Sequence, residues 1–253
     1  MRPKFTRFPT VVVDGFLSSP NAVREYGLSL DYFPTPGYYP GQRSKNLIEV
    51  NKKFADELLK KVFSLYWEDT SNISCSYCSF FFQKIPPYSE VETDFRNFGW
   101  IHRDSVWERN RLAGVLYLTP GARLESGTSV YRMKEGLEGS PVDHVAQQKV
   151  RDSKDFLFTE KSEFLTEDDL ERIKTIQNDW NGCFETITQV NNVYNRVISF
   201  DGNEWHAANN YYTGDQERLT IVYFIDNVKG ATMPKDRVVK DNLTEIINAP
   251  TET

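Results

Sequence analysis

The pattern of apolar and polar positions divides the chain into a helical first part and a strand-rich second part. Between residues 46 and 67, apolar side chains recur every three or four positions and lysines fall on the other face. This spacing predicts one amphipathic helix lying against a sheet. A shorter helix is expected over residues 18–30, entered through a Ser-Pro pair, after a buried strand at Val11–Val13. Residues 1–70 are therefore expected to form a helical support.

From residue 74 onward, the hydrophobic period changes to two, which is typical of strands. Six short runs rich in β-branched and aromatic residues are separated by turn residues; they cover residues 74–85, 111–120, 127–132, 183–190, 195–202 and 218–226. No helix alternates regularly with them, so the pattern favours an antiparallel assembly over a parallel α/β sheet. We therefore expect a mainly β fold with flanking helices and a core over about residues 74–227, within a single domain of residues 1–253.

Three segments interrupt this pattern. Residues 134–180 are polar and include a helix that Thr166 caps, and an insertion between strands is a natural place for a lid or a partner surface. Residues 31–44 contain three prolines and two glycines, which predicts a loop without regular structure. Its tyrosines either grip a ligand or pack on the body of the protein. Residues 228–253 form a polar extension that wraps the surface or is mobile.

Composition narrows the class of protein. The chain has 253 residues, of which 39% are hydrophobic and 26% charged with mixed signs, as in soluble globular domains. The net charge of -6 argues against a nucleic-acid partner. No stretch is long enough to span a membrane, and the apolar run near the N-terminus is interrupted at Asp14. With only three cysteines, and Cys75 and Cys78 as a lone pair, we expect a cytoplasmic protein without a closed zinc site.

The three histidines of the chain suggest a metal site. His102 and Asp104 are two positions apart, so on an extended strand their side chains share one face. His144 lies in the polar insertion, whereas His206 follows a strand and an Asp-Gly turn. If these strands are neighbours, His102, Asp104 and His206 converge, and two histidines with one carboxylate are typical of non-haem Fe(II) oxygenases. The alternative is a histidine that is merely hydrogen-bonded to a nearby carboxylate.

A second pair of residues suggests an anion site. Arg218 and Thr220 are two apart in the last β-rich run and are expected on the same face. A buried guanidinium requires an anion, and a neighbouring hydroxyl can add one hydrogen bond. A dicarboxylate that chelates the metal at one end and reaches Arg218 at the other would satisfy both sites.

Two segments carry a resemblance to a known family. They read "HRDSVWERNRLAGVLYLTPGARLESGTSVYR" and "RVISFDGNEWHAANNYYTGDQERLTIVYFID". With the H-x-D, the later H and the R-x-T, they resemble the prolyl 4-hydroxylase-like branch of the Fe(II)/2-oxoglutarate-dependent dioxygenases, over about residues 98–227. The resemblance implies a double-stranded β-helix, or jelly roll, with helices on one sheet. The turn "ARLESGTSVY" keeps only part of the usual Gly-Gly-acid pattern, and the long insertion is atypical of the smallest members.

The resemblance also implies residue roles and an activity. His102, Asp104 and His206 would bind Fe(II), and Arg218, Thr220 and Tyr117 would bind the distal carboxylate of 2-oxoglutarate. With O2 as second cosubstrate and ascorbate as a candidate stimulant, the enzyme would hydroxylate a C–H of a peptidyl or free amino-acid side chain, or of a small metabolite. Succinate and CO2 would be released. Retention of Asp104 favours hydroxylation over halogenation, because a halogenase needs that coordination position for halide.

Two other functions remain open at this point. One is a metal enzyme of the cupin type that does not use 2-oxoglutarate, which the pair of Arg218 and Thr220 disfavours. The other is a non-catalytic jelly-roll binding module, which has no reason to keep three open-faced ligands. Residues 34–44 and the insertion are expected to determine the substrate, a small molecule or peptide whose identity the sequence does not name. The oligomeric state is equally open.

Overall fold

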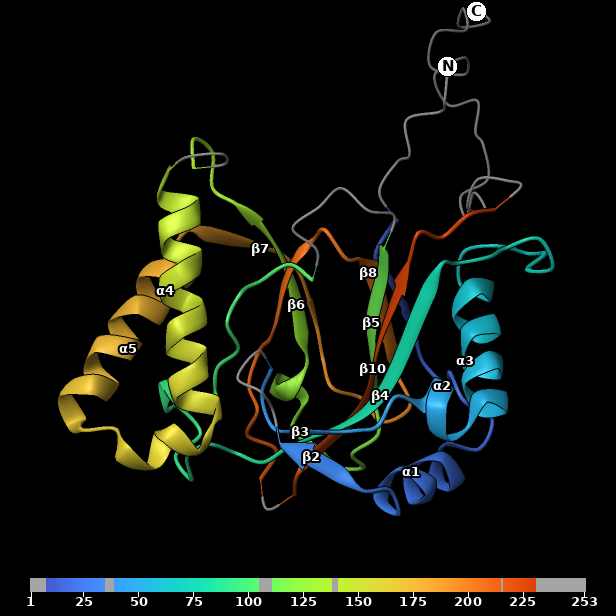
Figure 1. Ribbon diagram of the computed structural model, residues 1–253, viewed down its shortest axis with the longest axis horizontal. Helices are drawn as coiled ribbons and strands as arrows, with labels where there is room; N and C mark the ends of the chain where they lie inside the picture. Colours follow the sequence, from blue (N-terminus) through green and yellow to red (C-terminus); the bar gives the residue numbers. More distant parts are fainter. Residues whose placement is uncertain (1–7, 35–38, 105–110, 138–140, 215, 231–253) are drawn as a thin grey trace, which may run out of the picture.

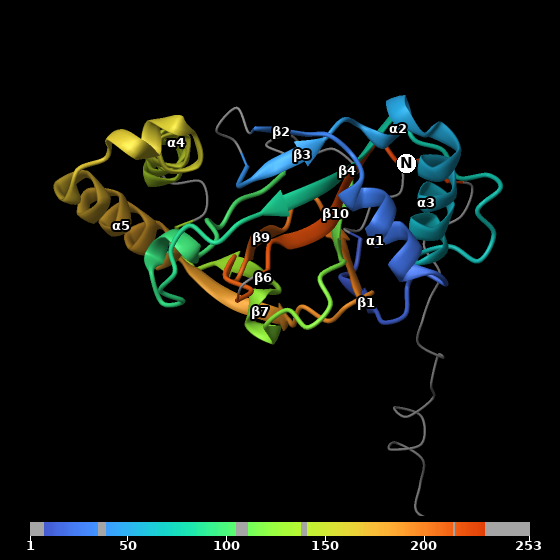
Figure 2. The same ribbon diagram turned by 90° about the horizontal axis from the view of Figure 1, so that it is seen from below.

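The structure is a computed structural model that describes residues 8–34, 39–104, 111–137, 141–214 and 216–230. Two antiparallel sheets lie against each other (Figures 1 and 2). The larger sheet consists, in spatial order, of β1 (Val11–Val13), β8 (Val197–Asp201), β5 (Arg111–Tyr117), β10 (Arg218–Asp226), β4 (Tyr77–Ile85), β3 (Gln42–Ser44) and β2 (Tyr32–Pro34). The smaller sheet consists of β7 (Phe184–Val190), β6 (Thr128–Met133) and β9 (Trp205–Ala208).

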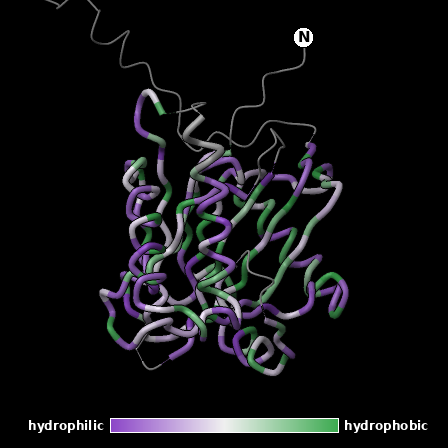
Figure 3. The backbone as a smooth tube through the Cα atoms, turned by 60° about the vertical axis from the view of Figure 1, so that its left-hand side comes forward, coloured by the Kyte–Doolittle hydropathy of each residue, from purple (hydrophilic) through white to green (hydrophobic). Residues whose placement is uncertain are grey.

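Strand β10 is central to the larger sheet and is covered on both faces. It pairs with β4 on one side and β5 on the other, so that Thr220 lies opposite Tyr117. The odd-numbered apolar residues of β10, such as Ile221, join the core beneath the N-terminal helices. The even-numbered positions, including Arg218 and Thr220, face the smaller sheet, because side chains alternate along a strand. Burial on both faces explains the nearly continuous apolar run in this segment. Figure 3 shows long hydrophobic (green) stretches in the extended segments of the molecule.

The N-terminal helices cover the outer face of the larger sheet (Figures 1 and 2). They are α1 (Pro20–Leu28), α2 (Leu47–Val50) and α3 (Lys52–Ser64). The single helix expected over residues 46–67 is wrong in one respect, because Asn51 leaves the helical conformation with φ -154° and divides it in two. The Asn51 side chain accepts a hydrogen bond from the Phe54 amide and so caps the start of α3.

The polar insertion folds into two helices beside the smaller sheet (Figure 1). Helix α4 (Pro141–Phe158) was not anticipated as a separate element, whereas α5 (Glu167–Asn181) begins at Thr166 as predicted. The Thr166 hydroxyl accepts from the Asp169 amide, and the Asp169 carboxylate accepts from the Thr166 amide, which forms a capping box. Trp180, near the end of α5, is buried against Trp205 of β9. This contact anchors the insertion to the sheet that carries His206.

Two further expectations about regular structure were wrong. Residues 31–44 contain β2 and β3, which form a short antiparallel pair at the edge of the larger sheet. An edge strand tolerates Pro34 because its missing amide hydrogen would not be needed for pairing. Strand β9 was also missed; His206 follows β8 and its turn, as expected, but lies within this further strand. Short 3-10 turns occur at Phe95–Asn97, Leu124–Ser126 and Glu160–Phe164.

Among the described residues, no helix has the length and apolar character needed to cross a membrane.

Candidate metal centre

The backbone brings the two histidines opposite each other. His102 and His206 form an isolated antiparallel bridge, in which His102 N donates to His206 O at 3.0 Å and His206 N donates to His102 O at 2.9 Å. The sequence had suggested a regular strand at His102. The structure instead has an extended segment there, which is hydrogen-bonded to β9. The Asp104 amide donates to Gly202 O at 3.1 Å, and this bond holds the Asp104 backbone beside the turn that precedes β9. The convergence expected for His102, Asp104 and His206 is present.

Each histidine has its outer nitrogen fixed by the backbone. His102 Nδ1 lies 2.7 Å from the carbonyl oxygen of Trp100, and His206 Nδ1 lies 2.9 Å from that of Glu204. A carbonyl oxygen can only accept, so both Nδ1 atoms carry the hydrogen. In its neutral form, each ring would therefore present the lone pair of Nε2 to a metal. Burial, with a further contribution from His206, lowers the pKa of His102 and favours its neutral form.

The three side chains form a compact donor set. His206 Nε2 is 3.3 Å from Asp104 Oδ2 and His102 Nε2 is 3.8 Å from Asp104 Oδ1. The ligand atoms lie within 4.8 Å of one another, and no other such group occurs among the described residues. Two imidazole nitrogens and one carboxylate on one side of a cavity fit a divalent transition metal with open positions. The side chain of His144 lies outside the part of the chain that is described.

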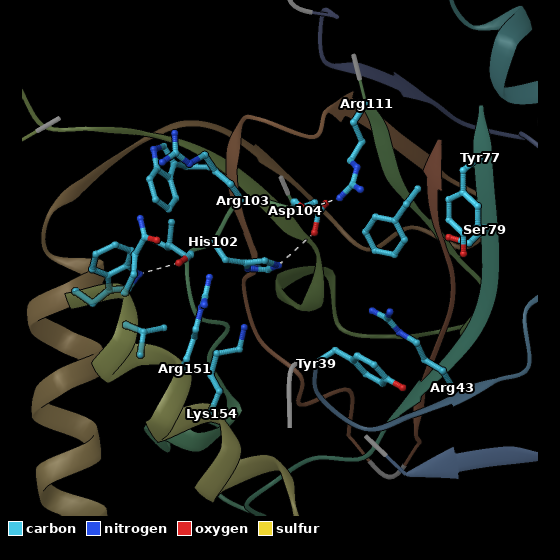
Figure 4. A pocket seen from close by; sticks show the side chains of 16 residues that line it. Tyr39, Arg43, Tyr77, Ser79, His102, Arg103, Asp104, Arg111, Arg151 and Lys154 are labelled. Carbon is cyan, nitrogen blue, oxygen red and sulfur yellow. Dashed lines mark hydrogen bonds and ion pairs between the residues drawn. The ribbon is translucent and has the colours of Figure 1, made fainter. Parts of the chain in front are cut away.

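Two arginine side chains fix the position of the segment that carries His102 and Asp104. Arg111, at the start of β5, donates from Nε and Nη2 to the carboxylate of Asp226 at the end of β10, the latter bond at 2.9 Å. Its Nη1 donates to the carbonyl oxygen of Asp104. The Arg103 guanidinium lies 4.0 Å from the ring centre of Trp205 and points away from the triad (Figure 4). Sequence reasoning did not identify Arg111 as a positioning residue, because its partners are distant in sequence.

The predicted anion-binding residues also lie together. Arg218 is 3% exposed, and its Nε donates to Ser126 O at 3.0 Å. No carboxylate of the described residues pairs with it, and its guanidinium lies 5.5 Å from the Tyr117 ring. The hydroxyls of Thr220 and Tyr117 are buried without a hydrogen-bond partner among the described residues. Burial lowers the pKa of Arg218 and raises that of Tyr117, yet the arginine remains cationic.

Two cavities share His102 and Asp104 in their walls, and one of them also reaches Arg218. An inner cavity of about 90 Å³ is lined by the triad together with Arg218, Gln83 and Tyr211. A second cavity of about 430 Å³, called the outer cleft, also has His102 and Asp104 in its wall (Figure 4).

Arg43 and Lys154 line both cavities, and sequence reasoning identified neither of them. It had indicated only the segments that carry them, residues 34–44 and the insertion. The spacing of Gln147, Val150, Arg151 and Lys154, which repeats every three or four residues, could have indicated a helix face turned toward the site.

The two-sheet core has counterparts among solved oxygenase structures. HygX from Streptomyces hygroscopicus with iron bound aligns with a TM-score of 0.50 and 11% identity, over 86% of this chain and 81% of that chain. HygX with nickel and 2-oxoglutarate bound gives 0.47 and 12%, over 86% and 82%. A Pseudomonas putida prolyl-4-hydroxylase gives 0.41 and 15%, over 86% and 92%. The two antiparallel sheets and the alignment with iron-bound HygX confirm the fold predicted from sequence, a double-stranded β-helix as in prolyl 4-hydroxylase-like oxygenases.

By sequence, the chain belongs to the family of unknown function DUF6445, whose match covers residues 4–225. That range includes both halves of the candidate site, from His102 to Thr220. Among curated proteins, none matches the chain.

Proposed function

We propose that this protein is an Fe(II)- and 2-oxoglutarate-dependent dioxygenase that hydroxylates a C–H bond of a small molecule or an amino-acid side chain. One observation carries the proposal. A single cavity is bordered by two histidine Nε2 atoms and a carboxylate, and also by a buried arginine that lacks an acidic partner among the described residues. HygX, which shares the fold, has been solved with iron bound. Succinate and CO2 are the expected co-products.

Each residue has a role that follows from its surroundings. His102, His206 and Asp104 would hold Fe(II), and bound iron would supply the activation of O2 for oxidation of the substrate. The backbone carbonyls of Trp100 and Glu204 keep both rings oriented before any metal arrives. Because the Nδ1 hydrogens are already engaged, metal binding requires no change of tautomer. The negative charge of the Asp104 carboxylate would offset one of the two positive charges of Fe(II).

The far end of the cavity suits the second carboxylate of 2-oxoglutarate. Arg218 offers terminal N–H donors in a planar fork, and Thr220 and Tyr117 offer hydroxyls that have no other partner among the described residues. A cupin-type enzyme without a keto acid would have no use for this arrangement. Two more features belong to the proposal: a single domain in which the helices α4 and α5 act as a lid, and a cytoplasmic location, which fits the three free thiols.

The test is an anaerobic titration of the full chain with Fe(II) and then 2-oxoglutarate, following the visible charge-transfer band of the chelated keto acid. Wild type should develop the band. The affinity of Asp104→Ala for Fe(II) should be lower than that of wild type by about 100-fold or more. Arg218→Ala should keep iron but bind 2-oxoglutarate at least about 30-fold more weakly, since truncating one partner of a buried charge pair costs about 2–5 kcal/mol. Equal iron affinity in all three proteins would contradict the proposed site. Iron binding without the band would favour a cupin-type enzyme.

A further inference from the structure

The outer cleft has a charge opposite to that of the whole protein. The chain carries a net charge of -6, yet the described residues lining the cleft include five basic side chains and a single acid. The basic residues are Arg43, Arg103, Arg111, Arg151 and Lys154. The acid is Asp104, which is already committed to the triad. A basic cleft on an acidic protein concentrates anions locally.

Two of these cations are engaged elsewhere and do not contribute to the excess. Arg111 is paired with Asp226, and the Arg103 guanidinium stacks on Trp205. Arg151 is exposed to solvent and, although its side chain also extends toward the cleft (Figure 4), it does not border the inner cavity. The excess charge near the triad therefore comes mainly from Arg43 and Lys154, which also border the inner cavity.

Arg43 is held in place but not neutralised. Its guanidinium lies 3.7 Å from the ring centre of Tyr39 and 5.6 Å from that of Phe224. Its Nε donates to Gln83 Oε1 at 3.3 Å, and no carboxylate of the described residues forms an ion pair with it. Four N–H donors on the terminal nitrogens remain, and the group points into the cleft (Figure 4). A desolvated guanidinium between aromatic rings gains most from a bidentate anion.

Lys154 approaches from the opposite wall. It lies on the face of α4 formed by Gln147, Val150, Arg151 and Lys154, and its amino group reaches toward His102 (Figure 4). None of the described acids lies within ion-pair distance of this amino group. Two unpaired cations from different elements, β3 and α4, thus face one space beside the open side of the triad. Trp180, Trp205 and Phe224 supply its apolar walls.

We propose that the outer cleft binds a small organic substrate that carries a carboxylate or phosphate group, with Arg43 and Lys154 as its specificity-determining contacts. The cleft volume of about 430 Å³ is in the usual range for small-molecule sites. The anionic group lies between β3 and α4, and the apolar part of the molecule lies along the aromatic walls. This inference rests on the proposed function for the identity of the reaction, but the anion site itself requires only the geometry of the cleft.

The experiment uses the full chain loaded anaerobically with Fe(II) and 2-oxoglutarate, so that Arg218 is already occupied. Phenylacetate and phenyl phosphate are titrated calorimetrically against their neutral counterpart phenylacetamide. Wild type should bind the two anions about tenfold or more tightly than the amide. Arg43→Gln and Lys154→Gln should each lower the affinity for the anions by about tenfold or more and leave the affinity for the amide unchanged.

Matched controls separate a specific contact from a change of net charge. Arg132→Gln and Lys60→Gln remove the same charges from exposed positions on β6 and α3, and should leave anion binding as in wild type. The proposal is overturned if the amide binds as tightly as the anions, if no anion binds wild type with a Kd below about 10 mM, or if the Arg43 and Lys154 variants behave like the controls. It is also overturned if these two variants weaken 2-oxoglutarate instead of the probes.

The two proposals fail in different ways. If the charge-transfer band does not form in wild type, the oxygenase proposal fails, and the same titration on the metal-free protein still measures the anion site. Loss of anion affinity in Arg43→Gln under those conditions supports the site as a binding cleft. If the band forms in every variant but anions are not preferred, the oxygenase stands and the anionic substrate is excluded.

Discussion

At the scale of single residues, the site is defined by polar atoms that the protein leaves without partners. A buried hydroxyl without a hydrogen bond costs about 1–3 kcal/mol. The hydroxyls of Thr220 and Tyr117 are both buried and have no hydrogen-bond partner among the described residues. Arg218 adds a buried charge without an acidic partner there. These costs fall on residues that line one face of β5 and β10, directly opposite each other in the register. Other unsatisfied buried side-chain atoms occur at Arg24, Asn192, Asn209 and Tyr223. Thr220 and Tyr117 differ from these in lying beside Arg218, as the proposed 2-oxoglutarate site requires.

Thr220→Val tests this reading directly, because valine keeps the shape of threonine and removes only the hydroxyl. We expect the free energy of unfolding to stay the same or rise by about 1 kcal/mol, since an unsatisfied group is removed. The affinity for 2-oxoglutarate should fall by about five- to tenfold. Denaturant unfolding and titration of the keto-acid band measure the two quantities on the same preparation.

Thr119 provides the matched control, since its hydroxyl oxygen accepts from the Leu219 amide at 2.7 Å and is equally buried. Thr119→Val should lower the free energy of unfolding by about 1–2 kcal/mol and leave 2-oxoglutarate binding unchanged. If Thr220→Val destabilises the protein as much as Thr119→Val does, and binds 2-oxoglutarate normally, then Thr220 is a packing residue.

At this scale, the triad converges and Arg218 borders the same cavity, as expected from sequence, because these residues belong to short local patterns. The H-x-D and R-x-T spacings are properties of extended backbone, and they hold wherever the segment is placed. Arg43 and Lys154 could not be predicted in the same way. Their significance depends on β3 and α4 facing one cleft, which no spacing along the chain records.

At the scale of elements, the sequence predicted most of the periodic segments but missed the helix α4 and the short strands β2, β3 and β9. The runs that became β4, β5 and β10 have enough residues to show their period, whereas β2, β3 and β9 have three or four each. Such strands exist because a neighbour supplies their hydrogen bonds, as β6 does for β9. The break at Asn51 was missed for a similar reason. Its side-chain cap competes with a continuous helix that the apolar spacing alone would favour.

The contact between the His102 segment and β9 gives an element-scale prediction. Gly99 N donates to Ala208 O at 3.1 Å, and a Cβ at this glycine would lie 2.1 Å from the same oxygen. Gly99→Ala must therefore push the segment carrying His102 away from the strand carrying His206. We expect a loss of about 1–3 kcal/mol in the free energy of unfolding, together with a loss of metal affinity, measured by calorimetric titration with Ni²⁺.

Gly121→Ala is the comparison for that change. Gly121 has φ +69° and open space around its Cβ position, so alanine there costs about 1–2 kcal/mol through backbone strain alone. Metal affinity should remain that of wild type. An unchanged metal affinity in Gly99→Ala, despite lower stability, would show that the approach of the two segments does not control the site.

At the scale of the whole molecule, the site lies where the two sheets and the insertion meet. His206 belongs to the smaller sheet, Arg218 to the larger one, and Lys154 to the insertion between β6 and β7. His102 and Asp104 come from the segment that runs between the two sheets. The hydrophobic core follows the same division, with one cluster under the N-terminal helices and another joining α4 and α5 to the smaller sheet. A metal held by the triad would therefore add to the backbone hydrogen bonds that already join the segment of His102 and Asp104 to β9.

Metal binding should accordingly stabilise the entire fold. With free metal at 100 times its Kd, the native state gains about 2.7 kcal/mol, which for a chain of this size raises Tm by roughly 5–10 °C. Ni²⁺ serves as a redox-inert substitute for Fe(II), and differential scanning calorimetry measures the shift. Because the chain has only three histidines, metal binding to the unfolded state should offset little of this gain. Asp104→Asn keeps the shape of the carboxylate and removes its charge, so its Tm should not respond to Ni²⁺. A shift in Asp104→Asn equal to that in wild type would place the metal elsewhere on the protein.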